Sequence, residues 1–188
     1  MLCVMGQQYD ISLIYIEYGD DLFSYARHLG FDEDTAMDAV HDLFYKLCEN
    51  SDIYKDKENI KFYLFRILKN RLIDIQRTNR EYAGINDVEL NVELTFRLEV
   101  SVEDDFIAQE EREEIKLKIQ NILNGLTDRQ REIVYLRYIH EYSYEEIAQL
   151  MNISVVSCRN LLSKAMTKLK DSSIPVVTLM LIIKGLTY

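Results

Sequence analysis

Two short helical patterns follow one another across a tight turn in residues 143–170, and this feature restricts the possible folds most. Ser143 and Glu146 have the spacing of a capping box, in which two side chains close the first turn of a helix. The dipeptide Asn152-Ile153 forms the turn, and Ser154 is placed to cap the second helix. The pattern predicts a helix-turn-helix.

The second helix of this pattern has an apolar face and a polar, basic face. Its inward positions, at helical steps, are Val155, Cys158, Leu162, Ala165 and Leu169. The candidates for DNA contact lie on the other faces and are Ser154, Ser157, Arg159, Asn160, Ser163, Lys164 and Lys168. Such a helix suits insertion into a DNA groove with contacts to phosphates. The alternative is a helical hairpin with a solvated basic face.

The net charge of the chain is −10, although a protein that binds phosphate groups needs Lys and Arg. The charge is unevenly distributed, because residues 60–80 carry a net +5 and residues 116–170 a net +4. Acidic residues are concentrated in 1–59 and 81–115, with net charges of −9 and −10. A ligand responds to the local potential, so the two basic segments are compatible with nucleic-acid binding.

Helical periodicity also runs through the N-terminal half of the chain. Apolar residues at three- and four-residue steps predict a first helix that ends at Gly30. Asp32 or Asp34 caps a second helix. The buried stripe of this second helix consists of Ala36, Val40, Leu43, Phe44 and Leu47. A third helix extends over 60–80.

The third helix has two chemically different sides on a helical wheel. The apolar side consists of Ile60, Leu64, Ile67, Leu68 and Ile75. The aromatic and basic side consists of Phe62, Tyr63, Arg66, Lys69, Asn70, Arg77 and Arg80. Rings that stack on bases and cations that follow phosphates suit melted, single-stranded DNA. The alternative is that both aromatic residues belong to the core, while Arg71 and Arg77 pair with Asp74.

The stretch after the third helix has no helical period and is rich in acids, which predicts a flexible linker. Beyond it, Thr127 and Gln130 form a further capping box. We therefore predict an all-α protein with two small helical domains joined by a flexible acidic linker, the C-terminal domain being the helix-turn-helix. The predicted parts are domain 8–81, linker 82–108, domain 109–171 and apolar tail 172–188.

The string LTDRQREIVYLRYIHEYSYEEIAQLMNISVVSCRNLLSKAMTKLK, which ends at Lys170, resembles the promoter-binding C-terminal domain of extracytoplasmic-function (ECF) sigma factors. These are small two-domain sigma subunits of bacterial RNA polymerase. The resemblance implies that the helix beginning at Ser154 contacts the minus-thirty-five promoter element. It also implies that this domain meets the polymerase β flap.

A helix of the type D-x-V-Q-D-x-F-x-x-L docks on the polymerase β′ coiled coil in that family. His41 stands where this pattern has Gln. The positions that match are Asp38, Val40, Asp42, Phe44 and Leu47. The resemblance thus implies that core polymerase is bound by Asp38, His41, Asp42 and Phe44. Without the resemblance, an acidic helix face is simply a solvated surface.

A second family pattern, W-L-x-x-I-x-x-N-x-x-x-D-x-x-R, reads the minus-ten element. Here the matching string is YLFRILKNRLIDIQR, with Tyr63 in place of Trp. The resemblance implies that the aromatic and basic side of the third helix contacts the opened minus-ten strand. The partners it implies are core RNA polymerase, promoter DNA and an anti-sigma factor, and the function is promoter recognition, strand opening and transcription initiation.

The linker length is consistent with this function. If the two promoter elements lie about two helical turns apart, the domains must reach sites on the order of 70 Å apart. A linker of about 30 residues has a flexible span near 30 Å and an extended reach near 100 Å.

Besides His41 and Tyr63, three further positions depart from the family. Leu161 and Met166 stand where relatives usually carry basic residues, so the recognition helix is poorer in cations. Glu141 stands where a Gly usually ends the preceding helix, which requires a left-handed backbone at a non-glycine residue or a different helix end.

Other functions are less consistent with the sequence. A self-sufficient repressor or activator would bind duplex DNA as a dimer, without polymerase, and would have no use for the acidic and aromatic helices. Scattered histidines and the lack of a phosphate-binding glycine loop argue against an enzyme, and widely separated cysteines argue against a metal site or disulfides. We expect no catalytic residue and no cofactor.

The location of the protein follows from its two ends. The N-terminus has no secretory signal, and the apolar tail is shorter than the roughly 20 residues that span a bilayer, so we expect a cytoplasmic protein without stable membrane insertion. We expect the tail to pack on one of the two domains, with docking to an anti-sigma partner as the alternative.

Overall fold

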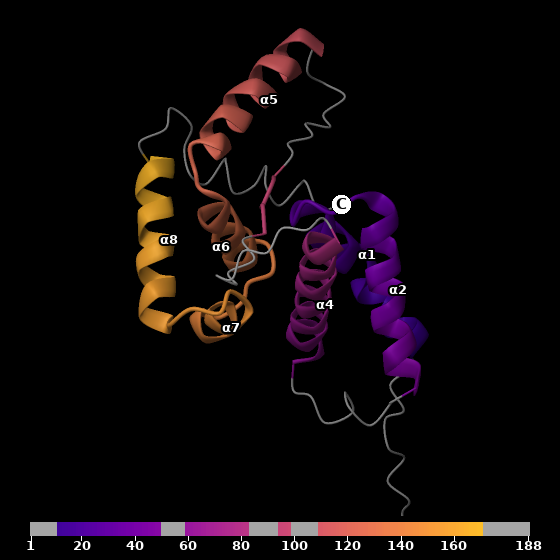
Figure 1. The fold of residues 1–188 in the computed structure, drawn as a ribbon. Helices are drawn as coiled ribbons and strands as arrows, with labels where there is room; N and C mark the ends of the chain where they lie inside the picture. Colours follow the sequence, from indigo (N-terminus) through magenta and orange to yellow (C-terminus); the bar gives the residue numbers. More distant parts are fainter. Residues whose placement is uncertain (1–10, 50–58, 83–93, 99–108, 171–188) are drawn as a thin grey trace, which may run out of the picture. The chain divides into compact units, whose positions relative to one another are not determined.

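The computed structural model describes residues 11–49, 59–82, 94–98 and 109–170, and all regular elements within these ranges are helices (Figure 1). They are α1 (Ile11–His28), α2 (Glu33–Glu49), α4 (Ile60–Tyr82), α5 (Gln109–Asn124), α6 (Asp128–Tyr138), α7 (Tyr144–Leu150) and α8 (Val155–Lys170). One compact unit contains α1 up to Arg27, with α2 and α4. The other contains α5 to α8 together with His28–Gly30. The predicted all-α class is confirmed.

Some of the predicted parts lie outside the described residues. They are the tail 172–188 and the linker residues 83–93 and 99–108. The described linker residues, Leu94–Leu98, belong to the C-terminal unit. None of the described helices has both the length and the apolar character needed to cross a membrane.

Local signals set the ends of α1 and α2. Gly30 has φ 88°, and the amide of Phe31 donates to the carbonyl oxygen of Ala26 at 3.4 Å, so a left-handed glycine ends α1 as predicted. Asp32, rather than Asp34, caps α2, because its carboxylate accepts the Thr35 amide and hydroxyl, each at 2.9 Å. These hydrogen bonds lower the pKa of Asp32.

Helix α4 packs against α2 through a face that the sequence analysis placed only in part. Its fully buried residues are Leu64, Phe65, Leu68 and Leu72. The Phe65 ring lies 5.0 Å from the ring of Tyr25 on α1. Ile67 and Ile75, which were predicted on the apolar side, are only half-buried. The true stripe is rotated because the helix has two neighbours, and a single wheel does not encode their positions.

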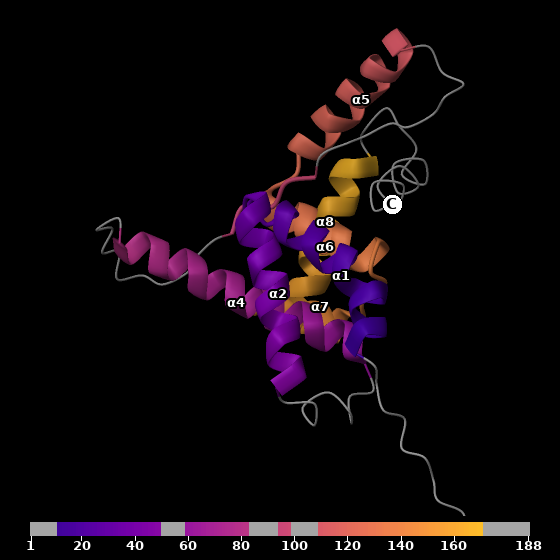
Figure 2. The ribbon, with the colours of Figure 1, turned by 90° about the vertical axis from the view of Figure 1, so that its right-hand side faces the viewer.

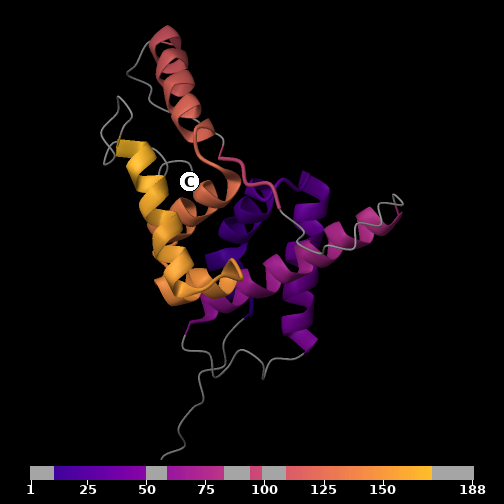
Figure 3. The same cartoon turned by 60° about the vertical axis from the view of Figure 1, so that its left-hand side comes forward.

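In the C-terminal unit, α8 runs beside α6, and α7 lies at one end of α8 and contacts both (Figures 1 and 3). The core between these helices includes Ile133, Ile147, Cys158, Leu162 and Leu169. Burial raises the pKa of the Cys158 thiol, with a smaller contribution from the charge of Glu145. The inward face predicted for α8 is confirmed except at Val155, which is half-buried.

Candidate nucleic-acid interface

Capping boxes begin α6 and α7, as predicted. Thr127 and Gln130 exchange hydrogen bonds of 3.3 and 3.1 Å at the start of α6. Ser143 and Glu146 do the same for α7, at 2.8 and 3.2 Å. Between these helices Glu141 has φ 59°, so a non-glycine residue occupies the left-handed position that the departure from the family required.

The turn of the helix-turn-helix is closed by backbone hydrogen bonds. Asn152 has φ 51°, and its amide donates to the carbonyl oxygen of Gln149 at 3.4 Å. The amide of Ile153 donates to the carbonyl oxygen of Ala148 at 2.9 Å, which completes a Schellman motif. The Ser154 hydroxyl then accepts the Ser157 amide at 3.0 Å and caps α8. These hydrogen bonds fix the angle between the two helices.

The solvent face of α8 carries every residue predicted to contact the minus-thirty-five element. Exposed side chains are those of Ser154, Ser157, Arg159, Asn160, Ser163, Lys164 and Lys168. Lys168 donates to the carbonyl oxygen of Gly125 at 3.0 Å, whereas Lys164 has no hydrogen-bond or ion-pair partner among the described residues. Lys164 is therefore the cation of this face that is most available to a phosphate.

The Arg159 side chain lies against α7. Its guanidinium lies 5.3 Å from the centroid of the Tyr144 ring, and Glu145 is 3.8 Å from it. Arg137 of α6 lies 5.2 Å from the centroid of the same ring. Tyr144 and Arg137 were not predicted from the sequence, because one ring and two cations from three helices meet only in the fold. The one signal in the sequence is an aromatic residue directly after the Ser143 cap.

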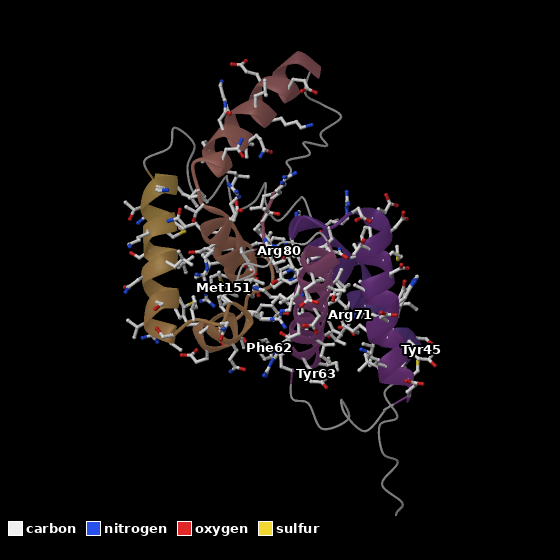
Figure 4. All side chains as sticks on the ribbon, viewed as in Figure 1. Tyr45, Phe62, Tyr63, Arg71, Arg80 and Met151 are labelled. Carbon is white, nitrogen blue, oxygen red and sulfur yellow. The ribbon has the colours of Figure 1, made fainter. Side chains whose placement is uncertain are left out.

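The exposed side of α4 carries Arg66, Asn70, Arg77 and Arg80. Phe62 and Tyr63 are half-buried in the first turn of the helix, and Arg80 lies at the other end (Figure 4). The second half of α4 extends beyond α2 (Figures 2 and 3). Lys69 is only 7% exposed, unlike the other predicted cations of this side.

Of the two ion pairs with Asp74 that the sequence suggested for α4, the structure contains the one with Arg77 and not the one with Arg71. Arg71 pairs with the Asp42 carboxylate of α2 at 2.9 Å rather than with Asp74. Arg77 does approach Asp74, at 3.8 Å, and both side chains are about half-exposed or more. Exposed pairs of this kind hold a side chain weakly. Arg77 is therefore easily redirected to a phosphate.

The acidic face of α2 presents Asp38 and His41 to solvent. Asp42 is partly covered by its pair with Arg71, and Phe44 is 6% exposed. Tyr15 of α1, which the sequence analysis did not single out, covers this site: its ring stacks at 6.3 Å on His41 and packs edge-on at 4.8 Å on Phe44.

Each unit matches a family model. Residues 14–82 match Sigma-70 region 2, and residues 116–169 match Sigma-70 region 4. The first span covers α2 and α4 with their acidic and basic faces, and the second covers the helix-turn-helix. The two models thus occur in one chain in the order that the sequence motifs predicted.

Similar proteins agree with these models. The ECF RNA polymerase sigma factor SigM of Bacillus subtilis is 25% identical over 169 residues, which cover 85% of this chain and 93% of SigM. The sigma factor RpoE of Bartonella quintana, solved in complex with the anti-sigma factor NepR, superposes with a TM-score of 0.58 at 22% identity over 86% of this chain and 95% of that one.

A further solved structure has the same fold. CnrH, solved with the cytosolic domain of CnrY, superposes with a TM-score of 0.52 at 22% identity and covers 88% of both chains. The two family models and the similarity to SigM over most of both chains agree. The chain belongs to the ECF-type sigma factors, non-enzymatic subunits that direct RNA polymerase to promoters and initiate transcription.

Proposed function

We propose a division of labour between the two units. The N-terminal unit binds core RNA polymerase with the acidic face of α2 and captures the opened minus-ten strand with α4. The C-terminal unit places α8 against the minus-thirty-five duplex and meets the β flap. The observation that supports this best is the presence of two separate exposed polar faces, on α4 and α8, each inside the matching sigma region.

Asp38 and His41 are the residues of α2 that are open to a basic coiled coil such as that of β′. Asp42 is shared with Arg71, so its charge is partly neutralised before docking. Phe44 supports this face from the interior, because its ring is buried and packs against Tyr15. We therefore assign direct contact with polymerase to Asp38 and His41, and assign Asp42 and Phe44 to holding this face in shape.

On α4, Tyr63 and Phe62 are placed to stack on unpaired bases at the start of the helix. Arg66, Asn70, Arg77 and Arg80 continue along the exposed side and follow the phosphates. Lys69 lies nearest the packed side, so we give it the smallest share of the contact.

On α8, Ser157, Asn160 and Ser163 offer hydrogen bonds to base edges, and Arg159 and Lys164 offer charge to the duplex. Ser154 and Lys168 make contacts within the unit that compete with DNA. The few remaining cations give this helix weak affinity of its own, and binding is completed by polymerase and α4.

We also infer an anti-sigma partner and a cytoplasmic location. RpoE of Bartonella quintana was solved with the anti-sigma factor NepR, and CnrH with the cytosolic domain of CnrY. This chain has the same fold, and a subunit of polymerase works where the chromosome lies.

Transcription from a genomic library tests the proposal. The protein is mixed with core polymerase and fragmented genomic DNA, and the transcripts are sequenced. We expect initiation at a small set of sites that share two elements about two helical turns apart. Tight binding to duplex DNA without polymerase, together with no promoter-selective transcription, would instead identify a self-sufficient repressor or activator.

A pair of charge reversals tests the docking face. Asp38→Lys should weaken binding to core polymerase, because it places a cation against a basic surface. Glu33→Lys is the matched control, since Glu33 is an exposed acid in the first turn of the same helix. If both variants lost the same affinity for core polymerase, Asp38 would not be part of the docking site.

A further inference from the structure

The segment Leu94–Leu98, which we call the linker arm, is held on the C-terminal unit. Its side chains alternate, with Phe96 and Leu98 buried and Thr95 and Arg97 exposed. Extended backbone directs successive side chains to opposite sides. The linker arm is therefore an extended peptide whose one apolar edge is inserted into the unit.

The backbone of the linker arm is bound as well. The Nε of Arg131, on α6, donates to the carbonyl oxygen of Phe96 at 2.7 Å. The side-chain Nε2 of Gln120, on α5, donates to the carbonyl oxygen of Leu98 at 3.1 Å. The Phe96 ring also lies 5.4 Å from the ring of Tyr135. Arg97 is bound through its own backbone, because its amide donates to the carbonyl oxygen of His28 at 2.8 Å and its carbonyl oxygen lies 2.8 Å from the His28 Nδ1. His28 is the last residue of α1 but belongs to the same compact unit as the linker arm. Backbone hydrogen bonds and two buried side chains thus hold a segment that has no secondary structure of its own.

The surface that receives the linker arm is preformed by Arg131. The same guanidinium donates to the carbonyl oxygens of Leu123 and Leu126, at 3.1 and 2.7 Å, and pairs with Asp128. These bonds close the turn between α5 and α6, and the Arg131 side chain is only 14% exposed. The Nε that binds Phe96 is therefore fixed in direction by the fold of the unit itself.

Seating the linker arm shortens the connection between the two units. Only residues 83–93 then join Tyr82, the end of α4, to the linker arm. Such a segment reaches about 40 Å when fully extended, with a flexible span near 20 Å. Promoter elements two helical turns apart are about 70 Å apart. With the linker arm released, residues 83–108 reach about 90 Å.

We propose that the linker arm docks on the C-terminal unit in the free protein and leaves this surface when both units engage promoter DNA. The proposal rests on the assignment of α4 and α8 to the two promoter elements. With the arm docked, the fully extended residues 83–93 cover about 40 Å of the distance of about 70 Å between the promoter elements. The units themselves must then span the remaining distance of about 30 Å. Release removes this restraint, so docking and simultaneous promoter binding compete.

Trypsin provides a local reporter of docking, because Arg97 is the only Lys or Arg between Arg80 and Arg112. Phe96→Ala in the full chain should raise the rate of cleavage after Arg97 by roughly tenfold or more, since cleavage follows the population of the undocked arm. Phe106→Ala makes the same substitution elsewhere in the linker and should leave the rate within about twofold of wild type.

Gln120→Ala is a second variant, which keeps Phe96 and removes the donor to Leu98. It should raise the cleavage rate by a smaller factor. Unchanged cleavage after Arg97 in both Phe96→Ala and Gln120→Ala would overturn the docking. This readout uses the free protein, so it does not depend on whether the chain initiates transcription.

Release is tested with core polymerase and a promoter at limiting sigma concentration. Phe96→Ala should give transcript yields equal to or above those of wild type, because it removes a competing contact. A lower yield with unchanged binding to core polymerase would overturn release, since the docked arm would then be needed on the promoter. Failure of the proposed function would look different, because wild type itself would give no promoter-selective transcript.

Discussion

Helices α4 and α8 both present a polar, basic face to solvent, but different interactions hold them in place. The start of helix α8 is fixed by neighbours in sequence, from the Asn152 turn to the Ser154 cap at 3.0 Å, whereas its end is held at long range by Lys168, which donates to the carbonyl oxygen of Gly125 at 3.0 Å. Helix α4 is positioned by distant residues: Lys61 binds Asp21 on α1 at 2.8 Å, and Arg71 binds Asp42 on α2 at 2.9 Å. A helix position that is set by nearby residues can be predicted from the sequence, whereas one that is set by distant residues cannot.

The largest effect should come from the long-range core of α4. Phe65→Ala removes a fully buried ring that packs on Tyr25, and should cost about 3–5 kcal/mol of the stability of the N-terminal unit. Hydrogen exchange resolved by residue should show faster exchange in α2 and α4 with little change in α7 and α8. Equal acceleration of exchange in both units would show that the core around Phe65 does not act on the N-terminal unit alone.

Removing a local cap should have a smaller effect, confined to the helix-turn-helix. Ser154→Ala leaves the Ser157 amide without its acceptor and should cost about 1 kcal/mol, measured by chemical denaturation of the C-terminal unit. Ser163→Ala is the matched control, because Ser163 is exposed on the same helix and far from its start. If both variants lose the same stability, capping is not what positions α8.

A backbone substitution should act in the opposite direction. Glu141 has φ 59°, where a side chain costs roughly 1 kcal/mol relative to glycine, so Glu141→Gly should raise the midpoint of thermal unfolding of the C-terminal unit. Glu145→Gly, within α7, should lower it because a helical backbone is weakened. A lower midpoint for Glu141→Gly would mean that the Glu side chain itself stabilises this turn.

The weakest of these effects belongs to the pair between α2 and α4. Side chains of Arg71 and Asp42 are 42% and 50% exposed, so a double-mutant cycle with alanine should give a coupling of less than about 1 kcal/mol. It should shrink further in high salt. A coupling well above this value would show that the pair, rather than the core around Phe65, orients α4.

The helix-turn-helix could be predicted from the sequence almost in full, since Ser143, Asn152 and Ser154 act on residues at most five positions away. Helix α4 was found, but its buried stripe was misplaced: Phe65 and Leu72 were overlooked, because burial there is decided by α1 and α2. The linker arm was missed for the same reason. In the sequence, Phe96 and Leu98 are isolated apolar residues. Only the structure shows that Arg131 and Gln120 bind the carbonyl groups of these two residues.

The most direct test of two distinct reading helices compares Tyr63→Ala with Lys164→Ala in holoenzyme. Binding is measured to two DNAs: a fork in which the minus-ten strand is unpaired and the upstream element is absent, and a duplex with both elements. Tyr63→Ala should weaken fork binding by about 1–3 kcal/mol, and Lys164→Ala should leave it unchanged while lowering the salt slope on the duplex by about one. Equal weakening on the fork by both variants would contradict the account.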